Sequence, residues 1–131
     1  MIIRGEFDVK MQGEPPFDVV DGVTLMRASF DKRFHGALEA TSQVWMLASR
    51  TPVEGSGMYV AMERVKGTLE GREGTFALAH MGTMTRGAKE LVVRVVPDSG
   101  TGALAGIAGQ MQIDIVEGKH FYTFDYALEP R

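Results

Sequence analysis

The stretch GTLEGREGTF at residues 67–76 decides the fold class of this chain. Its glycines separate two segments in which apolar residues alternate with polar ones. The same phrase returns at residues 102–111 as GALAGIAGQM, with a weaker echo at residues 36–40. Glycine at a fixed place in such a pattern marks a tight turn or a close backbone approach. The repeat therefore predicts a repeated β-hairpin corner, and with it a closed or nearly closed β-barrel.

Apolar side chains recur at every second position through most of the chain, which is the period of a half-buried strand. In the clearest case, Met111, Ile113 and Ile115 share one parity, and Gln112 and Asp114 lie on the other. We predict an all-β fold with one eight-stranded antiparallel barrel, a size whose interior is filled by side chains or holds one small ligand. The predicted strands are residues 2–11, 24–35, 38–49, 58–69, 74–81, 90–96, 107–116 and 119–128.

The composition favours one compact barrel domain over residues 1–131, of which 44% are hydrophobic. Fourteen Lys and Arg against 17 Asp and Glu give a net charge of −3, and no basic run is present. A nucleic-acid partner is therefore not expected. The N-terminal residues lack the apolar centre of a secretory signal, and no run has the length of a membrane span. We expect a cytoplasmic protein without a membrane partner.

Several kinds of chemistry find no support in the sequence. The chain has no cysteine, which excludes disulfides, thiolate nucleophiles and Cys-ligated metals. His35, His80 and His120 lie on separate predicted strands without the close spacing of a metal-binding pair. No serine stands in a Gly-x-Ser-x-Gly elbow, and Gly100-Thr101-Gly102 is not followed by the rest of a phosphate loop. We predict no metal and no cofactor.

Residues 98–110 resemble the allene oxide cyclase and dirigent families, whose barrels carry a similar Gly-Thr-Gly segment followed by two further glycines. Over most of its length the chain is more similar to an uncharacterised bacterial domain-of-unknown-function family with an allene-oxide-cyclase-like barrel. That likeness is carried by residues 25–29, 62–65, 71–76, 80–83 and 123–126. It implies an eight-stranded antiparallel barrel with a central cavity and, because the plant barrels are trimers, a homo-oligomer. It implies no reaction, because one fold hosts unrelated functions.

Polar residues that share a parity with apolar ones are the candidates for a site inside the barrel. His80 shares its parity with Phe76 and Leu78, which predicts a partly buried imidazole. It would act as an acid or base, or serve a structural hydrogen bond. Glu63 shares its parity with Tyr59 and is the carboxylate expected to point inward, where it must be paired or protonated.

Arg27, between Leu25 and Ser29, is the candidate to pair with Glu63 inside the barrel. Such a pair would hold the carboxylate or carbonyl of a small molecule, or would be a structural salt bridge that fixes strand register. Aromatic residues of the segment 122–126 lie on one parity, and Asp125 lies on the other with Thr123. We therefore expect Asp125 to be a solvent-exposed acid.

Three functions remain open. The first is a binding barrel for a small, largely apolar molecule, with Arg27, Tyr59, Glu63 and His80 as ligand-binding residues. The second is an isomerase or cyclase that uses the same polar groups. The third is a self-associating protein with a filled core. The sequence therefore leaves the function unknown, and it leaves open whether the protein is an enzyme.

Overall fold

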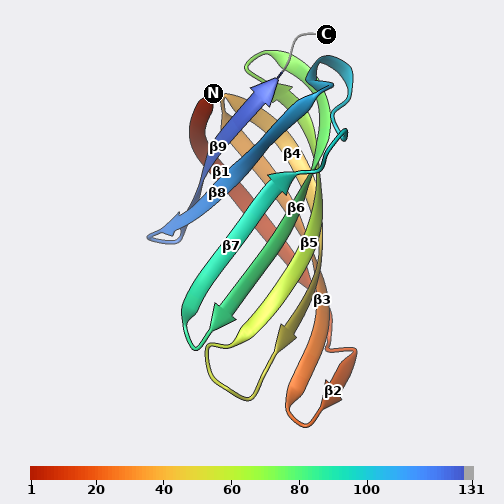
Figure 1. The fold of residues 1–131 in the computed structure, drawn as a ribbon, viewed down its shortest axis with the longest axis vertical. Coiled ribbons are helices and arrows are strands. Elements are labelled where there is room, and N and C mark those ends of the chain that lie inside the picture. Colours follow the sequence, from red (N-terminus) through yellow and green to blue (C-terminus); the bar gives the residue numbers. More distant parts are fainter. Residues whose placement is uncertain (129–131) are drawn as a thin grey trace.

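The computed structural model describes residues 1–128 and consists almost entirely of antiparallel strands (Figure 1). Within this range no helix has the length and apolar character needed to cross a membrane. The elements are β1 (Ile2–Gly13), β2 (Asp18–Val20), β3 (Val23–Gly36), β4 (Leu38–Arg50), β5 (Gly57–Leu69), β6 (Arg72–Thr85), β7 (Ala88–Val95), the short 3-10 helix η1 (Gly102–Leu104), β8 (Ile107–Val116) and β9 (Lys119–Leu128).

All eight predicted strands are present, as β1 and β3 to β9. β8 and β9 have the predicted bounds, and most of the others run further into the turns because their hairpin ladders continue there. β2, an exposed three-residue strand that pairs with the start of β3, was not predicted. Its residues, Asp18-Val19-Val20, follow two prolines and show no alternation, so no period-two signal marks them.

The strands form one antiparallel sheet in the order β1-β9-β8-β7-β6-β5-β4-β3-β2. A further pairing between β1 and β3 closes the eight long strands into a barrel, and β2 lies outside the closed ring. This arrangement confirms the predicted eight-stranded antiparallel barrel. Closure provides partners for strands that would otherwise expose sheet edges.

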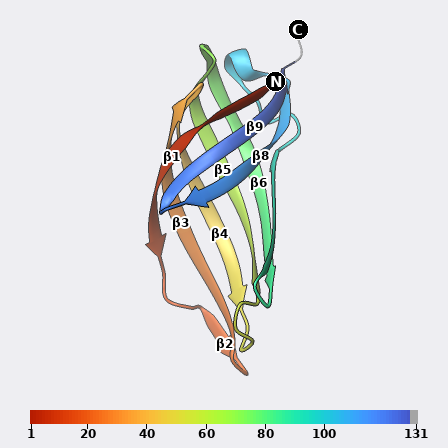
Figure 2. The same cartoon turned by 90° about the vertical axis from the view of Figure 1, so that its left-hand side faces the viewer.

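The barrel is enclosed on all sides in only part of its length. β8, β9 and β1 cross diagonally over the half that carries the N-terminus, whereas β3 to β7 extend beyond them (Figures 1 and 2). β7 and β8 share only the residue pairs Val93 with Met111 and Arg94 with Gln110. We call the enclosed half the closed end. The half that β3 to β7 extend into is the open end.

The glycine-rich phrase marks a hairpin corner in two of its three occurrences. Residues 67–76 run from β5 through a turn at Glu70 and Gly71 into β6, and the echo at residues 36–40 joins β3 to β4. For residues 102–111 the predicted corner is wrong. This copy forms η1 in the connection that follows β7 and then enters β8.

The two full copies of the phrase meet in space, which explains why both need glycine. A Cβ atom on Gly74 would lie 2.1 Å from the carbonyl oxygen of Thr101, and one on Gly102 would lie 2.9 Å from that of Glu73. The connection that contains η1 therefore passes directly against the start of β6. The second copy allows close backbone approach rather than a hairpin turn.

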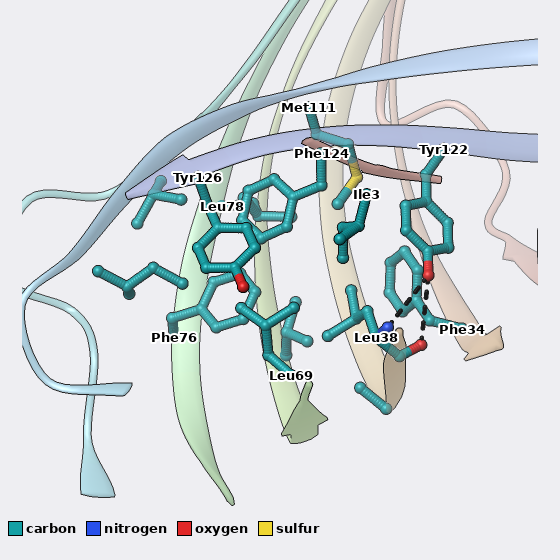
Figure 3. Packing of buried hydrophobic residues seen from close by; sticks show 14 of the residues in the cluster. Ile3, Phe34, Leu38, Leu69, Phe76, Leu78, Met111, Tyr122, Phe124 and Tyr126 are labelled. Atoms are coloured by element: carbon teal, nitrogen blue, oxygen red, sulfur yellow. Dashed lines mark hydrogen bonds between the residues drawn. The ribbon is translucent and has the colours of Figure 1, made fainter. Parts of the chain in front are cut away.

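An aromatic and aliphatic core fills the closed end (Figure 3). Phe76 and Phe124 stack with their ring centroids 5.7 Å apart, and Phe34 meets Tyr122 edge to face at 5.5 Å. The Tyr122 hydroxyl donates a hydrogen bond of 2.9 Å to the carbonyl oxygen of His35, and so satisfies its buried polar atom. Asp125, on the opposite parity, is exposed as predicted.

Candidate functional site

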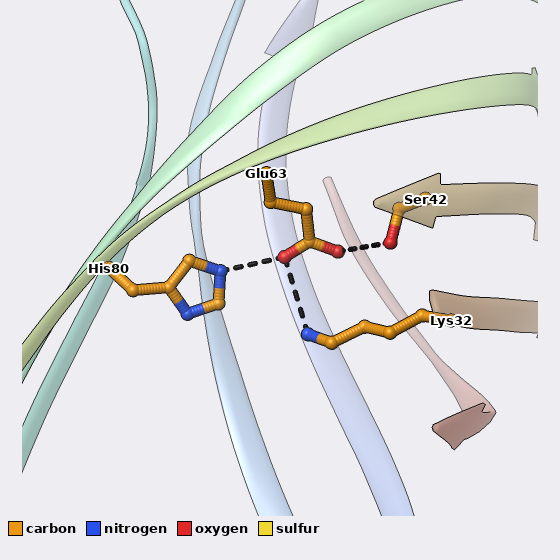
Figure 4. Close-up of polar contacts among 4 residues, drawn as sticks. All are labelled: Lys32, Ser42, Glu63 and His80. Atoms are coloured by element: carbon orange, nitrogen blue, oxygen red, sulfur yellow. Dashed lines mark hydrogen bonds and ion pairs between the residues drawn. The ribbon is translucent and has the colours of Figure 1, made fainter. Parts of the chain in front are cut away.

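A buried polar cluster lies in the middle of the barrel, next to the aromatic core. It consists of Lys32 from β3, Ser42 from β4, Glu63 from β5 and His80 from β6 (Figure 4). Lys32 pairs directly with Ser42 in the β3–β4 ladder. Each of the four positions shares its strand parity with core residues, so the alternation of the sheet directs all four side chains inward.

Glu63 is the acceptor for the other three members of this polar cluster. Its Oε1 accepts hydrogen bonds from His80 Nε2 at 2.7 Å and from Lys32 Nζ at 3.3 Å. Its Oε2 accepts one from Ser42 Oγ at 2.5 Å. The Glu63 side chain has no exposed surface. The prediction of a buried, paired Glu63 is thus confirmed.

These contacts keep Glu63 ionised in the interior. Burial alone would raise the pKa of its carboxyl group, since a charge is costly to remove from water. The hydrogen bonds from His80 and Ser42 and the positive charges of Lys32 and His80 act in the opposite direction, and the pKa is lowered from the ordinary 4.5. The cluster therefore holds an ionised carboxylate at neutral pH, with hydrogen bonds to both of its oxygens.

The ionised carboxylate fixes which nitrogen of His80 carries a proton. A carboxylate only accepts hydrogen bonds, so Nε2 must be the donor to Glu63. Nδ1 has no hydrogen-bond partner in residues 1–128, and this range contains no fully buried side-chain nitrogen or oxygen without a partner. Nδ1 therefore reaches accessible space. A neutral His80 presents a lone pair there.

His80 lines a pocket of about 270 Å³ inside the barrel. Most of its wall is apolar, and its polar members include His80, Lys32, Tyr59 and His120. Seven strands contribute, through Phe7, Val9, Phe30, Lys32, Val44, Met46, Tyr59, Ala61, His80, Ile113 and His120. A second hollow of about 610 Å³ lies towards the open end and shares Met46 and Tyr59 with this pocket. The barrel interior is thus filled only at its closed end.

Tyr59 stands between the pocket and the second hollow. Gly82, its partner in the β5–β6 ladder, makes room for the ring, because a Cβ atom there would lie 2.3 Å from Tyr59 Cε1. Burial and the nearby negative charge of Glu63 raise the pKa of the Tyr59 hydroxyl above 10.0. Tyr59 therefore remains a neutral hydrogen-bond donor at physiological pH.

The prediction that Arg27 points inward and pairs with Glu63 is wrong. Arg27 is exposed on the outer face, where its Nε lies 3.9 Å from Glu14 and its guanidinium lies over the ring of Phe17. Apolar residues occur on both parities of β3, and Leu25 with Ser29 indicated the wrong one. The cation inside the barrel is Lys32 instead.

Ser42 and Lys32 also belong to the polar cluster, and neither was predicted as a site residue. A signal for Lys32 was available, because it shares its parity with Phe30 and Phe34. Its ammonium group lies 4.9 Å from the ring centroid of Phe7 and 5.8 Å from that of Phe34. The attraction between the cation and these aromatic rings stabilises the buried charge. Ser42 carries the same kind of signal, because it shares its parity with Ala40 and Val44. Within residues 1–128, three or more His, Asp or Glu side chains nowhere gather as metal ligands would.

The fold and the site define a closed antiparallel β-barrel with a buried carboxylate–imidazole pair beside an interior pocket. The chain belongs to the DUF3224 family, described as a protein of unknown function, whose profile matches residues 3–126. This confirms the predicted membership of a bacterial family without an assigned activity.

Two further comparisons bear on the assignment. A crystal structure of a protein with unknown function from the DUF3224 family, from Shewanella oneidensis MR-1, is similar over 99% of this chain and 98% of that one. The two share 47% sequence identity with a TM-score of 0.94. No curated protein matches the chain. The comparisons establish the family and the fold, and they carry no ligand or reaction.

Proposed function

We propose that the barrel binds a small, largely apolar molecule in the 270 Å³ pocket and holds it by a hydrogen bond to His80 Nδ1. The observation that carries this proposal is the free acceptor nitrogen on an otherwise mostly apolar wall. Ligand pockets commonly combine apolar walls with a few fixed polar groups. The interior space counts against the alternative of a barrel with a filled core.

The polarity of the site restricts the ligand. Glu63 engages Nε2 of His80, so Nδ1 of the neutral ring is left to accept a hydrogen bond. The Lys32 ammonium group is already paired with Glu63. The ligand must therefore donate a hydrogen bond to Nδ1 and otherwise fit the apolar wall. A small ring system that carries one O–H or N–H group does both, whereas a ligand with acceptors alone leaves Nδ1 unsatisfied.

A matched pair of compounds tests this proposal. 5-Nitroindazole carries one N–H donor, and 1-methyl-5-nitroindazole has the same ring system without it. We expect the first compound to bind with roughly tenfold or greater preference, which is the usual net value of one hydrogen bond to a buried partner. Titration calorimetry measures both. His80→Phe, which offers no acceptor, is expected to remove the preference, and Arg27→Ala, on the outer face, to leave it unchanged. Failure of both compounds to bind would contradict the proposal.

The other parts of the sequence analysis remain predictions. Arg27 stays a predicted ligand-binding residue, although its side chain lies on the outer face and does not meet Glu63. Among the other predicted ligand-binding residues, Tyr59 and His80 line the pocket, and Glu63 orients His80. Self-association, cytoplasmic location and the likeness to allene oxide cyclase barrels are likewise still predictions.

A further inference from the structure

We infer that the Glu63–His80 pair is a general base, which removes a proton from an acidic C–H group of a small apolar substrate in the pocket. The inference rests on the proposed function, since the substrate must first occupy that space. Its basis is an imidazole on the pocket wall with one nitrogen engaged by a buried carboxylate and the other without a partner in residues 1–128.

His80 is held in a fixed orientation by Glu63. Glu63 Oε1 holds Nε2 at 2.7 Å, and Ser42 and Lys32 in turn hold the carboxylate. The imidazole is therefore kept in one tautomer with its basic nitrogen directed to accessible space. A base within reach of a bound substrate must already have this orientation to take up a proton efficiently.

The polar cluster also accommodates the charge that proton uptake creates. With His80 neutral, Lys32 and Glu63 balance each other and the cluster has no net charge. When Nδ1 takes up a proton, the new imidazolium already donates its Nε2–H to Glu63, and no group has to move. Such a preorganised carboxylate stabilises the cation that forms during proton transfer.

Loss of a proton places negative charge on the substrate, and Tyr59 lines the pocket where that charge appears. Ala61, the next inward-facing residue of β5 after Tyr59, pairs directly with His80. The Tyr59 hydroxyl has no hydrogen-bond partner in residues 1–128 and stays protonated at neutral pH. It is therefore a candidate donor to an oxygen or nitrogen that becomes negative.

The ring-opening elimination of 5-nitrobenzisoxazole is a direct probe of this chemistry. His80 Nδ1 takes the proton from C3, and the electron pair of that C–H bond forms the nitrile as the N–O bond breaks. The pair from the N–O bond remains on oxygen and gives the coloured 2-cyano-4-nitrophenolate. The imidazolium then returns its proton to water. The step needs no oxidant, metal or second substrate.

The experiment compares kcat/KM for the wild type, His80→Gln and His35→Ala. The His80→Gln side chain can still donate to Glu63, so the polar cluster is kept while the base is lost. His35 is the matched control, since it also pairs with a carboxylate, Asp8 at 2.8 Å, but lies outside the pocket. We expect a loss of about 100-fold or more in His80→Gln and no change in His35→Ala.

Binding of 5-nitroindazole, measured on the same samples, separates the two proposals, because it has the shape of the probe but no N–O bond to break. Binding that depends on His80, together with elimination no faster than in buffer, overturns the general-base inference and leaves the binding proposal standing. Absence of both overturns both. Elimination that persists in His80→Gln also overturns the inference.

Discussion

Glu63 shows how one residue can organise the interior of a small barrel. A buried carboxylate is costly unless its lone pairs are satisfied, and here three side chains from three other strands donate to it. Those donors fix the side chains of β3, β4 and β6 relative to β5. The same arrangement leaves His80 Nδ1 as the group that a bound molecule meets first.

Replacing Glu63 tests this description through stability. In Glu63→Gln the Lys32 ammonium group remains buried without a counter-ion, and we expect a loss of about 3 kcal/mol in the free energy of unfolding. Urea denaturation at pH 7 measures it. Glu73→Gln, an exposed carboxyl group on β6, is the control and is expected to change little.

The pH dependence of the same measurement has a defined sign. The pKa of Glu63 is lower in the folded protein than its ordinary 4.5, so the unfolded chain binds this proton first as the pH falls. The stabilisation by Glu63 is thus complete above about pH 4.5 and is lost as the pH falls through the folded-state pKa. Between these values the unfolding free energy of Glu63→Gln should depend less steeply on pH than that of the wild type. Equal slopes would argue against an ionised Glu63 in the folded protein.

The residues of this site could be predicted only in part. Glu63 and His80 were found because each interrupts a clear apolar parity on its strand, in β5 and β6. In β3 both parities carry apolar residues, and the rule that identified Glu63 then selected Arg27 instead of Lys32. Parity says which face a side chain occupies, but the choice between two mixed faces depends on strand pairing, which a single strand does not encode.

At the scale of the elements, glycine positions decide where strands and connections approach one another. The pattern was visible in the sequence, but the reason for it differed between copies. Residues 67–76 turn a hairpin, whereas Gly102 faces Gly74 across two touching segments. The second role needs a partner remote in sequence, so the phrase alone could not distinguish it from a turn.

Gly82 gives a test at this scale. In Gly82→Ala the new methyl group would lie 2.3 Å from Tyr59 Cε1, so the ring must move. We expect a destabilisation of about 1–3 kcal/mol from overpacking, and weaker binding of 5-nitroindazole because Tyr59 lines the pocket. Thermal unfolding and calorimetry measure the two effects. Gly13→Ala, where the methyl group meets nothing within 4 Å, is the control. An unchanged affinity with a normal fold would remove Tyr59 from the binding site.

For the whole molecule, strand number and order of appearance followed from periodicity, but the shape of the barrel did not. Eight alternating segments predict eight strands. Nothing in the alternation of β7 and β8 shows that their ladder has only two residue pairs, because both strands are long enough for more. How far two strands stay together depends on the twist of the whole sheet and on the connection through η1.

This uneven closure should appear in hydrogen exchange. β4, β5 and β6 are paired along nearly their whole lengths, so we expect their backbone amides to exchange most slowly. The amides in residues 88–92 of β7 that point away from β6 have no ladder partner and should exchange much faster. Exchange of peptides from the two regions, measured by mass spectrometry, provides the comparison. Equal protection would mean that β8 closes onto β7 in solution.

Trp45 is the one tryptophan of the chain, and it lies 54% exposed on the outer face of β4, pointing away from the interior. Its emission wavelength therefore reports the surroundings of the outer face of the barrel. A coloured molecule in the pocket is followed separately by its own absorbance. Two optical signals from one sample can thus be assigned to opposite sides of the same sheet. A blue shift of the indole emission on concentrating the protein, without a change in pocket occupancy, would identify contact between the outer walls of neighbouring molecules.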